Sequence, residues 1–218
     1  MKIEKEDFVT QRTARVYRLK ACTEQTKGII FAVHGYRQLG YYFLRKFQPL
    51  AELGYEVIAP EGLNRFYIEG YSGRVGASWM TKEERETDIK DYLAYLNGLL
   101  SQVRNEWPDL PFHLIGFSQG GATASRWLAS NDFPWKSFLL YASVFPNDFD
   151  FEGQQVRLKT IPSLMAFGDS DQFANEETIQ QKMDWLASKG IQPELHRFAG
   201  GHDVYKTVLI DIAKKLNW

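Results

Sequence analysis

The sequence has a single cysteine, Cys22, among 218 residues. One cysteine excludes an intramolecular disulfide, and no cysteine and histidine spacing typical of structural zinc sites occurs. Cys22 is also a poor candidate for a nucleophile, because Lys20, Thr23 and Glu24 make its surroundings polar. We therefore expect no disulfide framework and no bound metal, and a nucleophile of another residue type.

The chain also lacks an excess of charge of either sign. Its 26 lysine and arginine residues face 27 aspartate and glutamate residues, which leaves a formal net charge of −1. This balance provides no electrostatic basis for binding nucleic acid or an anionic membrane surface. We expect neither as a partner.

Long apolar runs are absent as well. No stretch approaches the ~20 apolar residues that span a bilayer, and residues 1–20 are charged without the apolar core of a signal peptide. From this pattern we expect a cytoplasmic protein without stable membrane insertion.

What the sequence does contain is an alternation of short apolar runs with segments of helical spacing. This alternation predicts an α/β fold, with a mostly parallel central sheet and helices on both faces. No repeat or linker interrupts it, so we expect one domain over residues 1–218. The expected strands cover 13–19, 27–33, 55–59, 112–117, 137–142, 161–167 and 193–198. The expected helices cover 41–53, 81–105, 175–188 and 205–216, with one more directly after Ser118.

The connections of this predicted fold carry their own signals. Thr81, with Glu84 three residues on, has the pattern of a capping box that opens a helix, and Pro49 predicts a bend within 41–53. Residues 60–80 show no regular period, and a connection of this length is typical of a functional loop. Residues 143–160 are likewise expected to form a loop.

The most informative stretch is Gly116-Phe117-Ser118-Gln119-Gly120, between an apolar run and a helix rich in small residues. The pattern G-x-S-x-G at a strand-to-helix turn holds the serine in a strained conformation, so that its hydroxyl projects from the sheet edge. The unpaired N–H of Gln119 would then lie near Ser118 and could stabilise an oxyanion. The alternative interpretation is an ordinary helix that begins at a serine cap.

A serine nucleophile needs a base, and four histidines compete for this role. His113 and His196 lie within predicted strands, where a structural histidine is the more common case. His34 directly follows a strand and suits the shaping of a neighbouring loop. His202 follows two glycines after the last strand, and we predict that it is the base.

A carboxylate must orient the histidine. Asp169 and Asp171 both follow the strand expected over 161–167, and either gives the chain order Ser, Asp, His of hydrolases with this architecture. Each could instead be a solvated loop residue or a charge at a helix N-terminus. The residues alone leave both open.

The chain resembles α/β-hydrolases of the phospholipase/carboxylesterase type, a group that includes the acyl-protein thioesterases. The resemblance rests on the segments IIFAVHGY, ASWMTKEERETDIKDYLAYL, LIGFSQGGATA, SLMAFGDSD and FAGGHD. It implies the α/β-hydrolase fold and a triad of Ser118, His202 and Asp171. It also implies oxyanion donors at the backbone N–H groups of Tyr36 and Gln119.

Departures from that family concern the substrate. After the His-Gly pair this chain has Tyr36-Arg37-Gln38 where the family commonly continues with Gly-Asp, and after the acid it has Gln172-Phe173-Ala174. No insertion long enough for a large lid domain is present. We expect an accessible cleft for short to medium acyl groups, lined by Tyr36, Tyr41, Phe66, Tyr67, Trp79, Phe145 and Phe173. Arg65 and Arg74 are either an anion site or solvated loop charges.

The sequence thus predicts a serine hydrolase that cleaves small-molecule esters or thioesters and needs no metal or organic cofactor. Alternatives are another acyl-transfer hydrolase, such as a peptidase or lactone hydrolase, or a non-catalytic binding protein on the same scaffold. The oligomeric state stays open, with a homodimer as one option.

Overall fold

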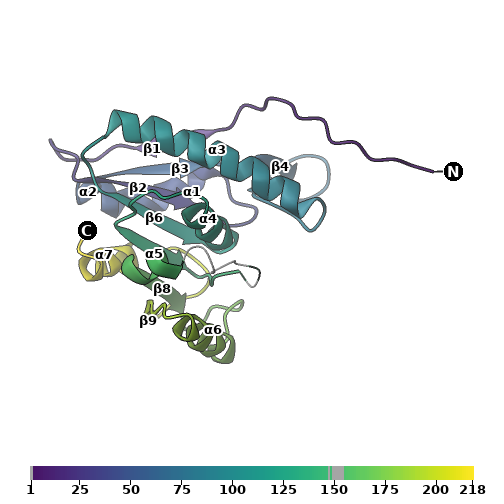
Figure 1. Ribbon diagram of the computed structural model, residues 1–218. Helices are drawn as coiled ribbons and strands as arrows, with labels where there is room; N and C mark the ends of the chain where they lie inside the picture. Colours follow the sequence, from purple (N-terminus) through teal and green to yellow (C-terminus); the bar gives the residue numbers. More distant parts are fainter. Residues whose placement is uncertain (1, 147, 149–154) are drawn as a thin grey trace.

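The computed structural model describes residues 2–146, 148 and 155–218, and it is built around one twisted sheet (Figure 1). The strand order in this sheet is β1-β3-β2-β6-β7-β8-β9. β1 pairs antiparallel with β3, and every other neighbouring pair is parallel. The strands are β1 Val16–Leu19, β2 Gly28–Val33, β3 Tyr55–Pro60, β6 Phe112–Phe117, β7 Ser137–Tyr141, β8 Ser163–Gly168 and β9 Glu194–Phe198.

Helices cover both faces of the sheet. They are α1 Gly40–Leu44, α2 Gln48–Glu52, α3 Arg85–Glu106, α4 Gln119–Ala129, α5 Gln155–Thr160, α6 Glu176–Ser188 and α7 Lys206–Lys215, with a 3₁₀ turn over Arg45–Phe47. In β2, Ile29 and Phe31 pack into a core with α3, α4 and α6, while Ile30 and Ala32 pack into a second core with α1, α2 and α7. Burial on both faces explains why the central strands are continuous apolar runs. The predicted fold class is confirmed.

The expected helix over 41–53 is interrupted. α1 passes through the 3₁₀ turn into α2, and Pro49 stands in the first turn of α2, where its missing N–H has no intrahelical acceptor to lose. Arg45–Phe47 thus joins two short helices in place of one long one. The bend expected at Pro49 lies at this junction.

The capping-box prediction is wrong. α3 begins at Arg85, Glu84 before it is left-handed with a φ of 52°, and its side chain makes no cap hydrogen bond. Thr81 instead donates its hydroxyl to the carbonyl of Glu83. The chain therefore turns once more before the helix starts.

Residues 60–80 hold a hairpin that the sequence analysis missed. β4 Asn64–Tyr67 and β5 Val75–Ser78 pair antiparallel in a small second sheet, and the isolated bridge between Gln38 and Ala77 connects this hairpin to the chain after β2. The expected loop at 143–160 also ends in a helix, α5, and residues 147 and 149–154 lie outside the described part. Within that part, the connections contain no additional domain, and no helix is long and apolar enough to cross a membrane.

Candidate active site

Ser118 stands on the turn between β6 and α4. Its φ of 53° and ψ of −122° lie outside the regions that an L-residue favours, as expected for a nucleophile elbow. Three hydrogen bonds hold this turn: the Ser118 N–H donates to the Tyr141 carbonyl at 3.1 Å, and the Ser118 carbonyl accepts from the Gly121 N–H at 2.9 Å and the Ser143 hydroxyl at 2.8 Å. The surrounding structure therefore fixes a strained residue.

The glycines of the elbow are required by close packing. A Cβ on Gly120 would lie 2.2 Å from the carbonyl oxygen of Val33, and a Cβ on Gly116 would lie 2.5 Å from the Cα of Gly121. α4 thus begins in direct contact with β2 and β6. This contact places the first N–H groups of the helix beside Ser118.

The structure brings Ser118, His202 and Asp171 together from three loops at the carboxyl ends of the strands. The Ser118 hydroxyl donates to His202 Nε2 over 2.9 Å, and His202 Nδ1–H donates to Asp171 Oδ2 over 2.8 Å. We assign the proton to Nδ1 because a carboxylate only accepts. Asp171 is fully buried as a side chain, whereas His202 exposes 19% of its side chain.

Asp169 lies elsewhere. Its side chain is 56% exposed and pairs with Arg197, whose Nε is 3.1 Å from the carboxylate. The other oxygen of Asp171 accepts the N–H of Phe173 at 2.9 Å, so both of its oxygens have partners. The geometry therefore distinguishes two aspartates that the residues alone left equivalent.

The candidate oxyanion donors, the backbone N–H groups of Tyr36 and Gln119, belong to segments that lie next to Ser118. Gly35, directly before Tyr36, packs so closely that an added Cβ would lie 3.1 Å from the Cβ of Ser118. Among the described residues, no partner is found for the Tyr36 N–H. Gln119 is the first residue of α4, so its N–H has no intrahelical acceptor. Both groups are available to an oxyanion.

The loop before Tyr36 is held by His34, which is fully buried. Its Nδ1–H donates to the Gly35 carbonyl at 2.8 Å, and its Nε2 accepts the Gly62 N–H at 2.9 Å. Burial lowers the pKa of His34 to about 4, so the ring is neutral at neutral pH. His34 thus shapes this loop, and its Nε2 is already engaged.

Trp79 has a part in the site that the sequence analysis did not find. Its indole N–H donates to the His34 carbonyl at 2.9 Å, and its backbone N–H donates to the side-chain oxygen of Gln119 at 3.1 Å. The Gln119 amide donates in turn to the Met80 carbonyl at 2.9 Å. The end of the hairpin is therefore bonded to both segments that carry the candidate oxyanion donors.

The aromatic residues predicted to line a cleft divide into two groups. The prediction is wrong for Trp79 and Phe145, because each exposes 1% of its surface and packs in the core. The others lie at the surface: Phe173 meets the His202 ring edge-on at 4.8 Å, Tyr36 stacks on Phe66 at 5.4 Å, and Tyr41 and Tyr67 are exposed.

Of the two arginines considered as an anion site, Arg65 is partly buried and lies 3.7 Å from the buried carboxylate of Glu61. Arg74 is exposed and lines a cavity of about 490 Å³ beside the loop of Arg37 and Gln38. Ser118 and His202 are not among the residues that line this cavity. Within the described residues, no group of three or more His, Cys, Asp or Glu side chains could hold a metal ion.

Comparisons with known proteins identify the fold and the family of the chain. Several solved structures share the fold, although the identities are low. An esterase named PE8 has a TM-score of 0.71 and 19% identity over 94% of this chain and 99% of that one. Acyl-protein thioesterase 2 of Zea mays has a TM-score of 0.70 and 20% identity over 94% and 98%. A carboxylesterase of Bacillus cereus has a TM-score of 0.65 and 14% identity over 94% and 93%.

No curated protein sequence matches the chain. The family model described as "Serine hydrolase (FSH1)" matches residues 23–207, which is most of the chain and includes Ser118, Asp171 and His202. The resemblance to serine-dependent α/β-hydrolases is confirmed, and the chain belongs to the FSH1 serine hydrolase family.

Proposed function

We propose that the protein cleaves carboxylic esters or thioesters of small to medium acyl groups through an acyl-enzyme on Ser118. The observation that carries this proposal is the chain of hydrogen bonds from the Ser118 hydroxyl through His202 to the buried carboxylate of Asp171. A serine hydroxyl is a weak nucleophile at neutral pH, and a base oriented in this way activates it.

In the first half of the reaction, Ser118 Oγ attacks the carbonyl carbon and its proton passes to His202 Nε2. Asp171 holds the imidazole in the correct tautomer and stabilises the cation that forms. The carbonyl oxygen becomes an oxyanion, and the N–H groups of Tyr36 and Gln119 stabilise it. When the tetrahedral intermediate collapses, the alcohol or thiol leaves with the proton from His202.

Water completes the cycle. His202 takes a proton from a water molecule, whose oxygen attacks the acyl carbon, and Ser118 leaves as the alcohol when the proton returns to it. The carboxylic acid is then released. Exposed Phe173 packs on His202, and exposed Tyr36 stacks on half-buried Phe66; these three residues form the proposed acyl contact, which agrees with an open cleft rather than a closed tunnel.

The natural substrate is proposed to be a small molecule rather than a macromolecule. Cys22 is an exposed free thiol, and this is compatible with a reducing compartment such as the cytoplasm, which we keep as the proposed location. Both ester and thioester substrates belong in the first screen, because esterases and an acyl-protein thioesterase share the fold.

The test is labelling with a fluorophosphonate, followed by mass spectrometry and by turnover of p-nitrophenyl esters and acyl thioesters of graded length. Labelling on Ser118 that vanishes in Ser118→Ala supports the proposal, and Ser118→Ala or His202→Ala should lower turnover by ~10⁴-fold or more. Ser101→Ala, on the exposed face of α3, is the matched control. If the folded protein is not labelled, the proposal is contradicted. If the protein turns over only lactones or peptides, these become the substrate class in place of esters and thioesters.

A further inference from the structure

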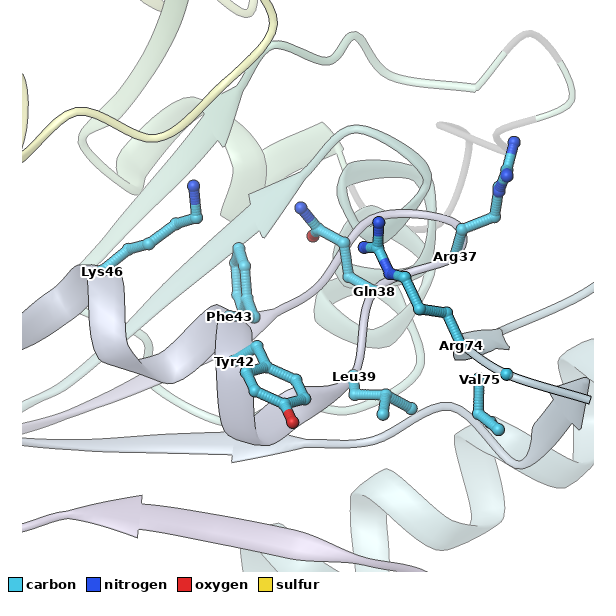
Figure 2. Close-up of a pocket in the computed structure, with 9 residues that line it drawn as sticks. Arg37, Gln38, Leu39, Tyr42, Phe43, Lys46, Arg74 and Val75 are labelled. Carbon is cyan, nitrogen blue, oxygen red and sulfur yellow. The ribbon is translucent and has the colours of Figure 1, made fainter. Parts of the chain in front are cut away.

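A cavity of about 490 Å³ opens next to the candidate active site, between the loop after β2, the helix α1 and the start of β5 (Figure 2). Its volume falls in the range of small-ligand sites. Leu39, Tyr42 and Val75 lie along the lower edge in Figure 2. The amino and guanidinium groups of Lys46, Arg74 and Arg37 lie in the upper half of the view.

The charged residues that line this cavity are all basic, while acidic Glu69 lines the adjoining cavity that shares Arg37 and Arg74. Arg37, Lys46 and Arg74 line it, and none of its lining residues is acidic. Within the part of the chain that the structure describes, Arg37 and Arg74 have no carboxylate within 4.0 Å, whereas Lys46 pairs with Asp203. Two arginines whose guanidinium groups have no carboxylate partner therefore line one cavity, and guanidinium groups are well suited to bind carboxylate or phosphate.

Arg37 occupies a backbone conformation that disfavours any residue with a Cβ atom. Its φ is 67°, in the left-handed region that glycine adopts without strain. The Arg37 N–H donates to the Ala77 carbonyl at 2.9 Å, which ties this residue to the hairpin. An arginine held in a strained position by its neighbours suggests that the side chain itself is used.

Single residues connect the cavity to the reaction centre. The Gln38 side chain, on the cavity wall, accepts the N–H of Gly35, which packs against Ser118. On the other wall, Phe43 contacts the ring of Phe117 at 6.0 Å, and that ring lies 5.0 Å from His202. The cavity wall is therefore in contact with Gly35, the neighbour of Ser118, and is linked to His202 through two packed rings.

We propose that this cavity binds a carboxylate or phosphate group of the substrate, with Arg37 and Arg74 as the recognition residues. The inference rests on the proposed function and narrows its substrate class to esters or thioesters that carry an anionic group. Arg65 is not part of this site, since it lies in a separate cavity with Arg15 and near buried Glu61.

The first experiment measures binding without catalysis. Adipate and inorganic phosphate are titrated by NMR into the Ser118→Ala protein, and the same titration is repeated after adding Arg37→Gln and Arg74→Gln. Shifts near residues 37–46 that are lost in the double variant support the proposal, and the ligand that binds more tightly identifies carboxylate or phosphate as the anion. Arg45→Gln is the matched control, because Arg45 is exposed nearby but does not line this cavity.

The second experiment measures selectivity. Mono-p-nitrophenyl adipate and p-nitrophenyl hexanoate share a six-carbon acyl chain and differ in the terminal carboxylate, and 4-carboxyphenyl and 4-methylphenyl butyrate make the same comparison in the leaving group. The kcat/KM ratio of the anionic to the neutral member of one pair should fall about tenfold for each arginine removed. High salt should lower this ratio for the wild-type protein, because salt screens the charges. The substitution Arg45→Gln should leave the ratio unchanged.

The outcomes separate this inference from the proposed function. The cavity assignment is overturned if the protein cleaves neutral esters, shows no arginine-dependent preference in either substrate pair and binds neither anion. The esterase proposal would then stay intact. The opposite result is anion binding that depends on Arg37 and Arg74, in a protein that neither cleaves esters nor reacts with the fluorophosphonate. That result would support the anion site and refute the proposed function.

Discussion

Asp171→Asn tests whether this carboxylate orients the base. In the native site one oxygen of Asp171 accepts from His202 Nδ1 at 2.8 Å and the other from the Phe173 N–H at 2.9 Å. Asparagine has one acceptor oxygen only. If that oxygen stays on the Phe173 N–H, the amide NH₂ faces His202, and the imidazole must carry its proton on Nε2, towards Ser118.

In that tautomer His202 cannot accept the serine proton. We expect kcat to fall by ~10⁴-fold, because the geometry is kept while the tautomer is wrong. This corresponds to about 5 kcal/mol in the activation free energy. The free energy of unfolding should fall by only about 1–2 kcal/mol, since the side-chain volume is unchanged and a charged hydrogen bond to His202 is replaced by a neutral one.

The assay is steady-state turnover of a short p-nitrophenyl ester, with a urea titration to verify folding. Asp169→Asn is the matched control, because Asp169 is 56% exposed and pairs with Arg197 instead of His202. Its kcat should stay within about twofold of the wild-type value. The reasoning is refuted if Asp171→Asn keeps more than about a tenth of the activity, or if the control loses as much.

Three further predictions concern stability and the neighbouring framework. Gly98 is exposed in α3, and a Cβ added there would have no atom within 4 Å outside the helix backbone in the described structure, so Gly98→Ala should raise the free energy of unfolding by about 0.5–1 kcal/mol in a urea titration. Gly120→Ala should lower the free energy of unfolding by more than about 2 kcal/mol, and equal effects of the two substitutions would contradict the close packing at the elbow. Burial lowers the pKa of His113 from 6.5 to about 4. The contribution of neutral His113 to the free energy of unfolding is therefore complete above pH 6.5 and is lost at ~1.4 kcal/mol per pH unit as the pH falls towards 4. In His113→Asn the free energy of unfolding should fall less steeply between about pH 6.5 and 5. Trp79→Phe removes the indole N–H that donates to the buried His34 carbonyl and should reduce kcat several-fold. Trp135→Phe removes a buried indole N–H that has no partner among the described residues, and it should leave kcat unchanged.

Local signals in the sequence were sufficient to predict the sheet and the position of Ser118. β2 and β6 are apolar over six residues each because both faces are buried, and glycines mark the sharp turn at the elbow. The alternation of strands with helices predicted that the sheet is mostly parallel. These features depend on few neighbours along the chain, so they can be inferred without a structure.

The missed features depend on contacts that are distant in sequence. β4 and β5 are four residues long, and their sequences NRFY and VGAS show no alternating pattern. They pair with each other, and the bridge from Ala77 to Gln38 connects them to the chain after β2. Lys46 and Asp203 are 157 residues apart. Trp79 meets a backbone carbonyl, and no side-chain pattern identifies such a partner. The aromatic ring of Trp79 led us to expect it in a pocket, but the hydrogen bond from its indole N–H to the His34 carbonyl holds it in the core.

The β4–β5 hairpin also matters for engineering the enzyme, because one of its ends contacts the reaction centre and the other is exposed. The end at Ser78 and Trp79 is bonded to the Gln119 side chain, so changes there would disturb the start of α4. Residues 68–73 at the tip are mostly exposed, and glycines 70 and 73 have no atom within 4 Å of an added Cβ. A library that varies only the tip can therefore change selectivity through the cavity wall while the reaction centre stays assembled.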